Sequence, residues 1–304
     1  MDDRIGQFLQ FLSVEKGASE NTIAAYRNDL AQFHSFLSTI NLNGNATDWR
    51  RVGSDAVLSF MVEMRTKRYA DATVARKVAA VKSFFQFLHA EGDIPLNPTE
   101  DLESPRVGKS LPKPLTVQQV DELLEQPAKR ATPEALRDRG MLELLYATGL
   151  RVSEMVSLNV DNVSLDSHNP YVRCIGKGSK ERLVPIHGQA LRAVAAYLED
   201  GRRRLLKDQQ QGALFLNRRG DRLTRQGFWL ILKQYARDAH LDEVLVTPHT
   251  LRHSFATHML RGGAPLRSVQ ELLGHANLST TQIYTQVTND HVRRVYEQAH
   301  PRAR

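Results

Sequence analysis

Apolar side chains recur at the helical spacing of three and four residues along the first hundred residues of the chain. The first stripe comprises Ile5, Phe8, Leu9 and Leu12, and a second, in residues 23–33, follows Ser19, a residue type that caps helices. A longer stripe in residues 72–89 comprises Val74, Val78, Val81, Phe85 and Leu88. Each stripe needs a partner to bury it, so the pattern predicts a small helical bundle.

Residues 104–114 (SPRVGKSLPKP) contain three prolines and one glycine, which is typical of an exposed connector. We therefore predict an N-terminal domain over residues 1–103 and a second domain over residues 115–304.

The second domain begins with further helical patterns and then changes to a β pattern. Thr116 is placed to cap one helix, and Gly149 to end the next. The runs YVRCI and RLVPI flank GKGSKE, which predicts a β-hairpin. Helical patterns then return in residues 188–206, 224–240, 248–261, 265–273, 279–287 and 289–299. The expected fold is mainly α, with one small antiparallel sheet in the second domain.

The charge of the chain predicts a polyanionic partner. The net charge is +7 and the pI is near 9.6. Residues 1–107 carry 12 basic and 14 acidic side chains, whereas residues 108–304 carry 29 and 20. We therefore expect the second domain to supply most of the grip on a polyanion such as DNA.

Cysteine usage and hydropathy predict a soluble cytoplasmic protein. Cys174 is the single cysteine, so no intramolecular disulfide can form. We recognise no leader peptide at the N-terminus and no stretch apolar enough to span a bilayer, so we expect no membrane association.

Five stretches of the second domain contain the residues that could carry chemistry: ATGLRVSE, IGKGSKER, TPHTLRHSFATH, LLGHANLSTT and IYTQV. Each is weak by itself, because an arginine after a glycine, a lysine in a turn or a tyrosine in a helix usually has a structural role. The chain lacks the phosphate-binding loop GxxxxGK[ST], the zinc motif HExxH and the serine elbow GxSxG. Arginine, lysine, histidine and tyrosine remain as the reactive candidates.

Those four residue types suit phosphoryl transfer without a metal ion or cofactor. Two arginines can bind the charge that develops on a phosphodiester. A lysine can protonate the leaving oxygen, and a histidine can assist proton transfer. A tyrosine beside such cations becomes a competent nucleophile.

The motifs ATGLRVSE, GKGSKERLVP, HTLRHSFATH and LLGH, with a tyrosine nine residues after the last histidine, resemble the tyrosine recombinases of the phage integrase family, in particular the Xer branch. The resemblance implies that Arg151 and Arg252 clamp the scissile phosphate, supported by Glu154. It further implies Lys177 as general acid, His249 as acid/base, His275 as a phosphate donor and Tyr284 as nucleophile.

The resemblance extends to the first domain, where SENTIAAYRNDLAQFHSFL and TVARKVAAVKSFFQFL are similar to the four-helix core-binding (SAM-like) domain of that family. In the family, the two domains close around DNA. Basic side chains outside the apolar stripes are either solvated or in contact with phosphates. The DNA-binding set that we predict comprises Arg65, Lys67, Arg68, Arg76, Lys77, Lys82, Lys180 and Arg182.

The resemblance predicts a recombinase that acts as a homo- or hetero-tetramer on double-stranded DNA through a Holliday junction, resolving chromosome or plasmid dimers at dif-like sites. The tail VYEQAHPRA is similar to the end of Xer proteins, whose last helix docks into a neighbouring subunit. A second Xer recombinase and a division-associated DNA translocase are the further partners that the family suggests. A mobile-element integrase, a tyrosine topoisomerase and a catalytically silent DNA-binding regulator are the alternatives.

Overall fold

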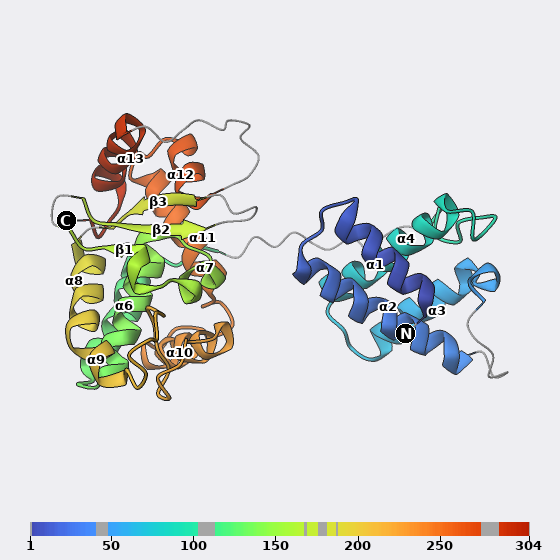
Figure 1. Cartoon of the computed structure of the whole chain (residues 1–304), viewed down its shortest axis with the longest axis horizontal. Helices are drawn as coiled ribbons and strands as arrows, with labels where there is room; N and C mark the ends of the chain where they lie inside the picture. Colours follow the sequence, from blue (N-terminus) through green and yellow to red (C-terminus); the bar gives the residue numbers. More distant parts are fainter. Residues whose placement is uncertain are drawn as a thin grey trace. The chain divides into compact units, whose positions relative to one another are not determined.

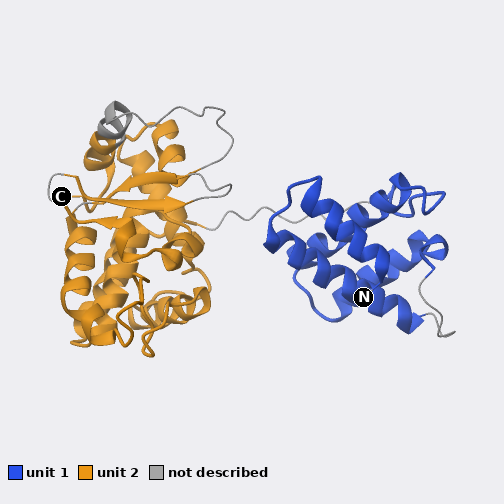
Figure 2. Cartoon of the chain, in the orientation of Figure 1, with its two compact units in different colours: residues 1–110 blue, residues 111–304 orange. Residues whose placement is uncertain are grey.

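The computed structural model describes residues 2–40, 48–102, 113–166, 169–175, 181–186, 188–274 and 286–303, with side chains in the last range from residue 293 onward. The chain forms two compact units, Met1–Ser110 and Leu111–Arg304 (Figure 2). Each unit has a hydrophobic core of its own. Most of the predicted connector lies outside the described residues, so its role as a linker stays a prediction.

The first unit is a helical bundle, and this fold prediction is confirmed (Figure 1). The stripe residues Ile5, Phe8, Leu9 and Leu12 are all buried. The Ser19 hydroxyl accepts a hydrogen bond from the backbone N–H of Thr22 at 3.2 Å, which is the predicted helix cap. The described residues of this unit form α1 (Asp3–Val14), α2 (Glu20–Ile40), α3 (Ser54–Thr66) and α4 (Asp71–Ala90), with a 3-10 turn at Trp49–Arg51.

The second unit is mainly helical, as predicted. The Thr116 hydroxyl accepts a hydrogen bond from the backbone N–H of Gln119 at 3.1 Å and caps the first helix. No helix within the described ranges is long and apolar enough to cross a membrane. The α-helices are α5 (Val117–Glu125), α6 (Pro133–Thr148), α7 (Val152–Ser157), α8 (Gly188–Ala196), α9 (Arg202–Leu205), α10 (Arg225–Asp238), α11 (Pro248–Arg261), α12 (Leu266–Leu273) and α13 (Gln286–Ala299), with 3-10 turns at Gln126–Lys129 and Val160–Asn162 and a π-helical turn at Tyr197–Gly201.

Helix α6 is the central helix of this unit, because side chains on all of its faces are buried. It packs against α8 and α11, among other elements. The helix ends at Gly149, whose φ of +59° is left-handed, as predicted for a terminating glycine.

The sheet has the strand order β1-β2-β3 and is antiparallel throughout. The predicted hairpin strands are confirmed as β2 (Tyr171–Ile175) and β3 (Glu181–Pro185), in a register that places Cys174 opposite Arg182. The two-residue strand β1 (Val163–Ser164) was not predicted, since so short a run carries no recognisable β pattern.

The C-terminal segment lies on the second unit of its own chain. Helix α13 packs against α11, α12 and β3. Beyond it, Arg302 donates to Glu143 at 2.6 Å and also to Asp121 and Gln189. A Cβ at residue 188 would lie 2.3 Å from the Arg302 carbonyl oxygen, so this close approach of the C-terminal segment requires a glycine at position 188.

Two buried histidines, His258 of α11 and His300 of the C-terminal segment, lie next to the ring of Tyr146. His300 is 4% exposed and stacks on the ring of Tyr296 at 4.9 Å. The Nδ1 atom of His258 lies 2.8 Å from the Tyr146 hydroxyl oxygen. Burial lowers the pKa of His300 to about 4, and burial also lowers the pKa of His258.

We predict that these histidines make the second unit sensitive to acid. Between pH ~6.5, the pKa of a histidine in an unfolded chain, and the native pKa near 4, the unfolded state binds more protons than the native state. The contribution of these histidines to the free energy of unfolding is therefore fully present above pH ~6.5 and is lost as the pH falls. The loss from His300 amounts to roughly 3 kcal/mol at most. Urea unfolding between pH 8 and 4.5 measures this loss. His300→Gln should flatten the profile, and an unchanged profile would contradict the assignment.

Candidate functional site

The end of α6 places the first predicted site residue. The backbone N–H of Gly149 donates to the Leu145 carbonyl at 3.0 Å, and the left-handed turn stops the helix. After the buried Leu150, Arg151 occupies the N-cap position of α7 with an exposed side chain. The sequence ATGLR thus ends one helix and begins the next within three residues, which fixes the backbone from which Arg151 projects.

Glu154 fastens Arg151 from the first turn of α7. One of its carboxylate oxygens accepts a hydrogen bond from the backbone N–H of Arg151 at 2.7 Å, and the other accepts one from Nη1 of Arg151 at 3.2 Å. The Glu154 side chain is 7% exposed, whereas that of Arg151 is 46% exposed. The carboxylate is therefore internal, and the guanidinium that it holds can reach a ligand.

Arg182, on β3, binds the same carboxylate. Its Nη1 and Nη2 atoms donate to the two oxygens of Glu154 at 3.0 and 2.9 Å, and its Nε donates to the Leu272 carbonyl at 3.2 Å. The side chain is 8% exposed. The guanidinium of Arg182 is therefore directed into the protein. Its predicted contact with DNA stays a prediction.

Arg252, on α11, lies in the same cluster. Its Nη1 donates to the carbonyl oxygen of Gly149, and its Nη2 donates to that of Leu273 at 2.7 Å. Burial, and then repulsion by Arg151, lowers the pKa of Arg252 to about 10. That value still leaves Arg252 charged at neutral pH.

The cluster holds more positive than negative charge. Burial by itself would raise the pKa of Glu154, but hydrogen bonds from Arg182 and from the Arg151 backbone outweigh it and lower that pKa. Glu154 is therefore ionised at neutral pH, and the three guanidinium groups around it leave two formal positive charges. The partly exposed Arg151 and the adjacent Arg252 thus form a site suited to an anion such as a phosphodiester.

His249 lies at the start of α11, one turn before Arg252, with an exposed side chain. The Thr247 hydroxyl accepts the backbone N–H of Thr250 at 3.0 Å and caps this helix. The ammonium of Lys233, on α10, donates to the carbonyls of Val246, at 2.8 Å, and Glu243. The segment that precedes His249 is thus tied to α10.

The remaining predicted residues of the second unit lie outside the described residues. They are Lys177, Lys180, His275 and Tyr284. Their roles stay predictions.

The predicted DNA-binding residues of the first unit divide into two groups. Arg65, Lys67 and Arg68 are exposed at the end of α3 and in the turn after it, where phosphates could reach them, although Lys67 also pairs with Glu63. Their role in DNA binding stays a prediction.

Three further basic residues of this unit have partners on α2 or after α4. Arg76 pairs with Asp29 but is 45% exposed, and the ammonium of Lys82 donates to the Leu102 carbonyl at 2.6 Å. The side chain of Lys77 is 3% exposed, and its ammonium donates to Asp29 at 2.9 Å. The predicted contact of Lys77 with DNA stays a prediction. Lys77 neutralises a buried carboxylate of the core.

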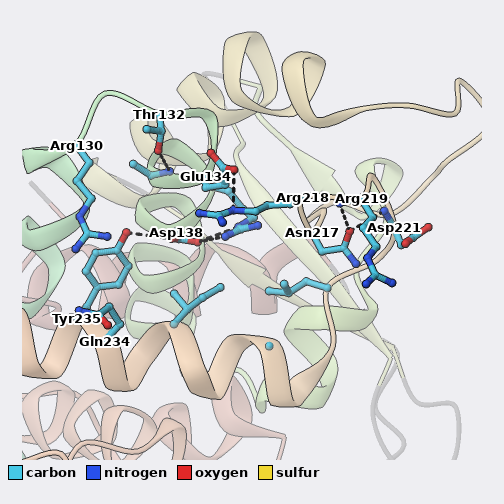
Figure 3. Close-up of a pocket in the computed structure, with 15 residues that line it drawn as sticks. Arg130, Thr132, Glu134, Asp138, Asn217, Arg218, Arg219, Asp221, Gln234 and Tyr235 are labelled. Atoms are coloured by element: carbon cyan, nitrogen blue, oxygen red, sulfur yellow. Dashed lines mark hydrogen bonds and ion pairs between the residues drawn. The ribbon is translucent and has the colours of Figure 1, made fainter.

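Sequence reasoning did not single out a charged pocket of about 490 Å³ beside α6 and α10 (Figure 3). Its signal in the sequence is the run NRRGDR at residues 217–222. Three of the arginines that line the pocket have acidic partners: Arg130 pairs with Asp238, Arg137 with Asp138, and Arg218 with Glu134. The pocket therefore resembles a structural ion-pair network more than an anion site. Within the described ranges, no group of three or more histidine, cysteine or acidic residues is placed to hold a metal ion.

Comparison with known families gives two matches that together span most of the chain. The profile described as "Phage integrase family" matches residues 113–291. The profile described as "Phage integrase, N-terminal SAM-like domain" matches residues 5–92. The first match covers Arg151, Glu154, Arg182 and Arg252.

Two relatives align with the chain over almost its whole length. "Tyrosine recombinase XerC" of Herpetosiphon aurantiacus is 54% identical over 299 residues, which is 98% of this chain and 95% of the relative. "Tyrosine recombinase XerD" of Halalkalibacterium halodurans is 46% identical over 303 residues, covering 100% of this chain and 99% of the relative.

Solved structures support the fold. XerH recombinase bound to palindromic difH substrate, in a post-cleavage complex, has a TM-score of 0.70 at 23% identity, covering 96% of this chain and 84% of that one. A lambda integrase tetramer bound to a Holliday junction has a TM-score of 0.63 at 14% identity, covering 91% and 75%.

We predict that Gly149→Ala weakens the second unit at the site itself. A Cβ there would lie 2.4 Å from a ring carbon of Phe255, and the φ of +59° already strains an L residue. Gly263→Ala is the matched control, because its φ is also positive but no atom lies within 4 Å of the new Cβ. Gly149→Ala should cost roughly 2 kcal/mol more in urea unfolding than Gly263→Ala. Equal losses of unfolding free energy in the two variants would mean that Phe255 moves away from the new Cβ without a cost in stability, and would contradict the prediction.

Proposed function

The chain belongs to the phage integrase family as a tyrosine recombinase, an enzyme that cleaves and rejoins DNA at specific sites, and on this premise we propose that Tyr284 is its nucleophile. Attack by the phenol oxygen on a phosphodiester forms a 3′-phosphotyrosine bond and releases a 5′ hydroxyl. The reverse attack by a 5′ hydroxyl restores the DNA strand and frees the tyrosine.

The observation that carries this proposal is the convergence of Arg151 and Arg252 in a cluster whose one carboxylate is shared with Arg182. In the transition state, charge accumulates on the non-bridging phosphate oxygens, where guanidinium groups stabilise it. Since Glu154 cannot neutralise all three arginines, positive charge remains for the phosphate.

The other roles follow the family's motifs and complete the proposal. Lys177 protonates the leaving 5′ oxygen, His249 assists proton transfer, and His275 donates a hydrogen bond to the phosphate. Cleavage then proceeds without a divalent metal ion. Arg65, Lys67, Arg68, Arg76 and Lys82 of the first unit, with Lys180 of the second, contact the DNA backbone.

The biological role that we propose is the resolution of chromosome or plasmid dimers at dif-like sites in the cytoplasm. Relatives named XerC and XerD at 54% and 46% identity support it. We propose a tetramer on two DNA duplexes that exchanges strands through a Holliday junction, with a second Xer recombinase and a division-associated translocase as candidate partners.

We also propose that the last helix connects subunits in that tetramer. In the isolated chain, this segment is bound to its own unit, with Arg302 paired to Glu143. Connection through this segment therefore requires the same contacts to form with a neighbouring copy.

Tyr284→Phe tests the nucleophile. The variant should bind its site with parental affinity, because only the hydroxyl is lost, yet form no covalent adduct on a nicked DNA that traps the cleaved strand. Denaturing gel electrophoresis of protein with labelled DNA measures the adduct. Adduct formation by Tyr284→Phe would identify another nucleophile.

Lys177→Ala tests the general acid. An alkoxide leaves poorly without a proton, whereas a thiolate, whose thiol has a pKa near 8.5, leaves readily. The variant should therefore cleave ordinary DNA at least about 100-fold more slowly than the parent and recover on DNA with sulfur at the bridging 5′ position.

Lys180→Ala is the control for this test, since Lys180 is the nearest alternative lysine in sequence. It should show neither the defect nor the recovery. Recovery by Lys180→Ala in place of Lys177→Ala would reassign the general acid.

A further inference from the structure

We propose that Arg182 is a positioning residue for strand cleavage, which keeps Glu154 from neutralising Arg151 and so leaves Arg151 charged toward the scissile phosphate. The inference rests on the proposed function, because it concerns the phosphate clamp of that reaction. Arg182 does not contact the phosphate in this account. It acts through Glu154.

The hydrogen bonds of Glu154 carry the first step. Arg182 donates to both carboxylate oxygens at 2.9–3.0 Å, a bidentate pair between two side chains that are each no more than 8% exposed. Arg151 takes the remaining positions through its backbone N–H at 2.7 Å and a single longer bond from Nη1 at 3.2 Å. Of the three side-chain hydrogen bonds that the carboxylate accepts from these two arginines, two come from Arg182 and one comes from Arg151. Arg182 therefore holds the larger share of the carboxylate.

The end of α12 carries the second step. Arg182 donates to the carbonyl of Leu272 at 3.2 Å, and Arg252 donates to the carbonyl of the next residue, Leu273, at 2.7 Å. A Cβ at Gly274, which follows them, would lie 3.0 Å from Nη1 of Arg182. Arg182 and Arg252 are therefore positioned against the same helix end, and Arg182 transmits that position to Arg151 through Glu154.

The physical consequence of losing Arg182 follows from the balance of charges. A buried carboxylate without its partner costs several kcal/mol, so Glu154 would turn to the nearest remaining cation. Arg151, already 3.2 Å away, would become its bidentate partner. The charge of Arg151 would then be neutralised and its guanidinium drawn away from the scissile phosphate, although residue 151 itself is unchanged.

Two variants separate this role from simple stabilisation. Arg182→Met should slow single-turnover cleavage on nicked DNA by about 100-fold, the scale expected when a reacting group is displaced. Adding Glu154→Gln to it should restore part of the rate, because an amide cannot neutralise Arg151. The double variant also lacks the uncompensated buried charge, so it is the better folded of the two.

A double-mutant cycle gives the second readout. If Arg182 acts through Arg151, then Arg151→Ala combined with Arg182→Met should cleave no more slowly than Arg151→Ala alone. Methylphosphonate at the scissile position gives a third readout, because it removes a charged oxygen and hence part of the need for Arg151. The defect of Arg182→Met relative to the parent should shrink on that substrate.

Arg137→Met is the matched control. Arg137 is also a buried arginine of the second unit that pairs with a carboxylate, Asp138 at 2.8 Å, and donates to a main-chain carbonyl, Leu216 at 2.8 Å. No described hydrogen bond joins it to Arg151 or Glu154. Its variant should lower the unfolding temperature but should combine additively with Arg151→Ala and show no smaller defect on methylphosphonate.

The positioning role would be overturned if the effects of Arg182→Met and Arg151→Ala on the cleavage rate were additive. It would also be overturned if the double variant, Arg182→Met with Glu154→Gln, cleaved more slowly than Arg182→Met alone. Failure of the proposed function would look different. In that case, the parent itself would form no adduct on the phosphodiester, or Tyr284→Phe would retain one.

Discussion

Two helix ends supply the oxygen atoms on which the cationic site is built. The last carbonyls of a helix have no partner inside the helix, and cations are favoured near them by the helix dipole. Here, the carbonyl of Gly149 at the end of α6 and two adjacent carbonyls at the end of α12 accept hydrogen bonds from Arg252 and Arg182. The left-handed glycines that end these helices are therefore part of the site.

Because neutral carbonyls bind the guanidinium group of Arg252, these hydrogen bonds do not cancel its charge. A cluster balanced by acidic residues would have the same number of hydrogen bonds but no net attraction for DNA. Glu154 is the exception, and its position between Arg151 and Arg182 makes the distribution of one negative charge decisive for the clamp. The charged pocket beside α10 shows the contrast, since three of the arginines that line it are paired with acidic residues.

The sequence predicted those elements whose signals are local. Apolar spacing, a capping Ser19 or Thr116 and a terminating Gly149 each act within one helix, so the bundle and the helix ends were predicted correctly. It did not predict that Arg182 and Lys77 are internal. Their carboxylate partners lie 28 and 48 residues away in the chain, and only the tertiary fold brings them together. Basic residues are usually exposed, so exposure was the natural expectation.

The pairing of Cys174 with Arg182 across β2 and β3 gives the chain a built-in chemical reporter. The thiol is the single one in the chain and is 1% exposed, and burial raises its pKa to about 12. An alkylating reagent can therefore reach a reactive thiolate only while the core around Cys174 is open. The labelling rate of the unmodified protein then measures how often the core around Cys174 opens, beside the strand that holds Arg182, and it needs no engineered probe.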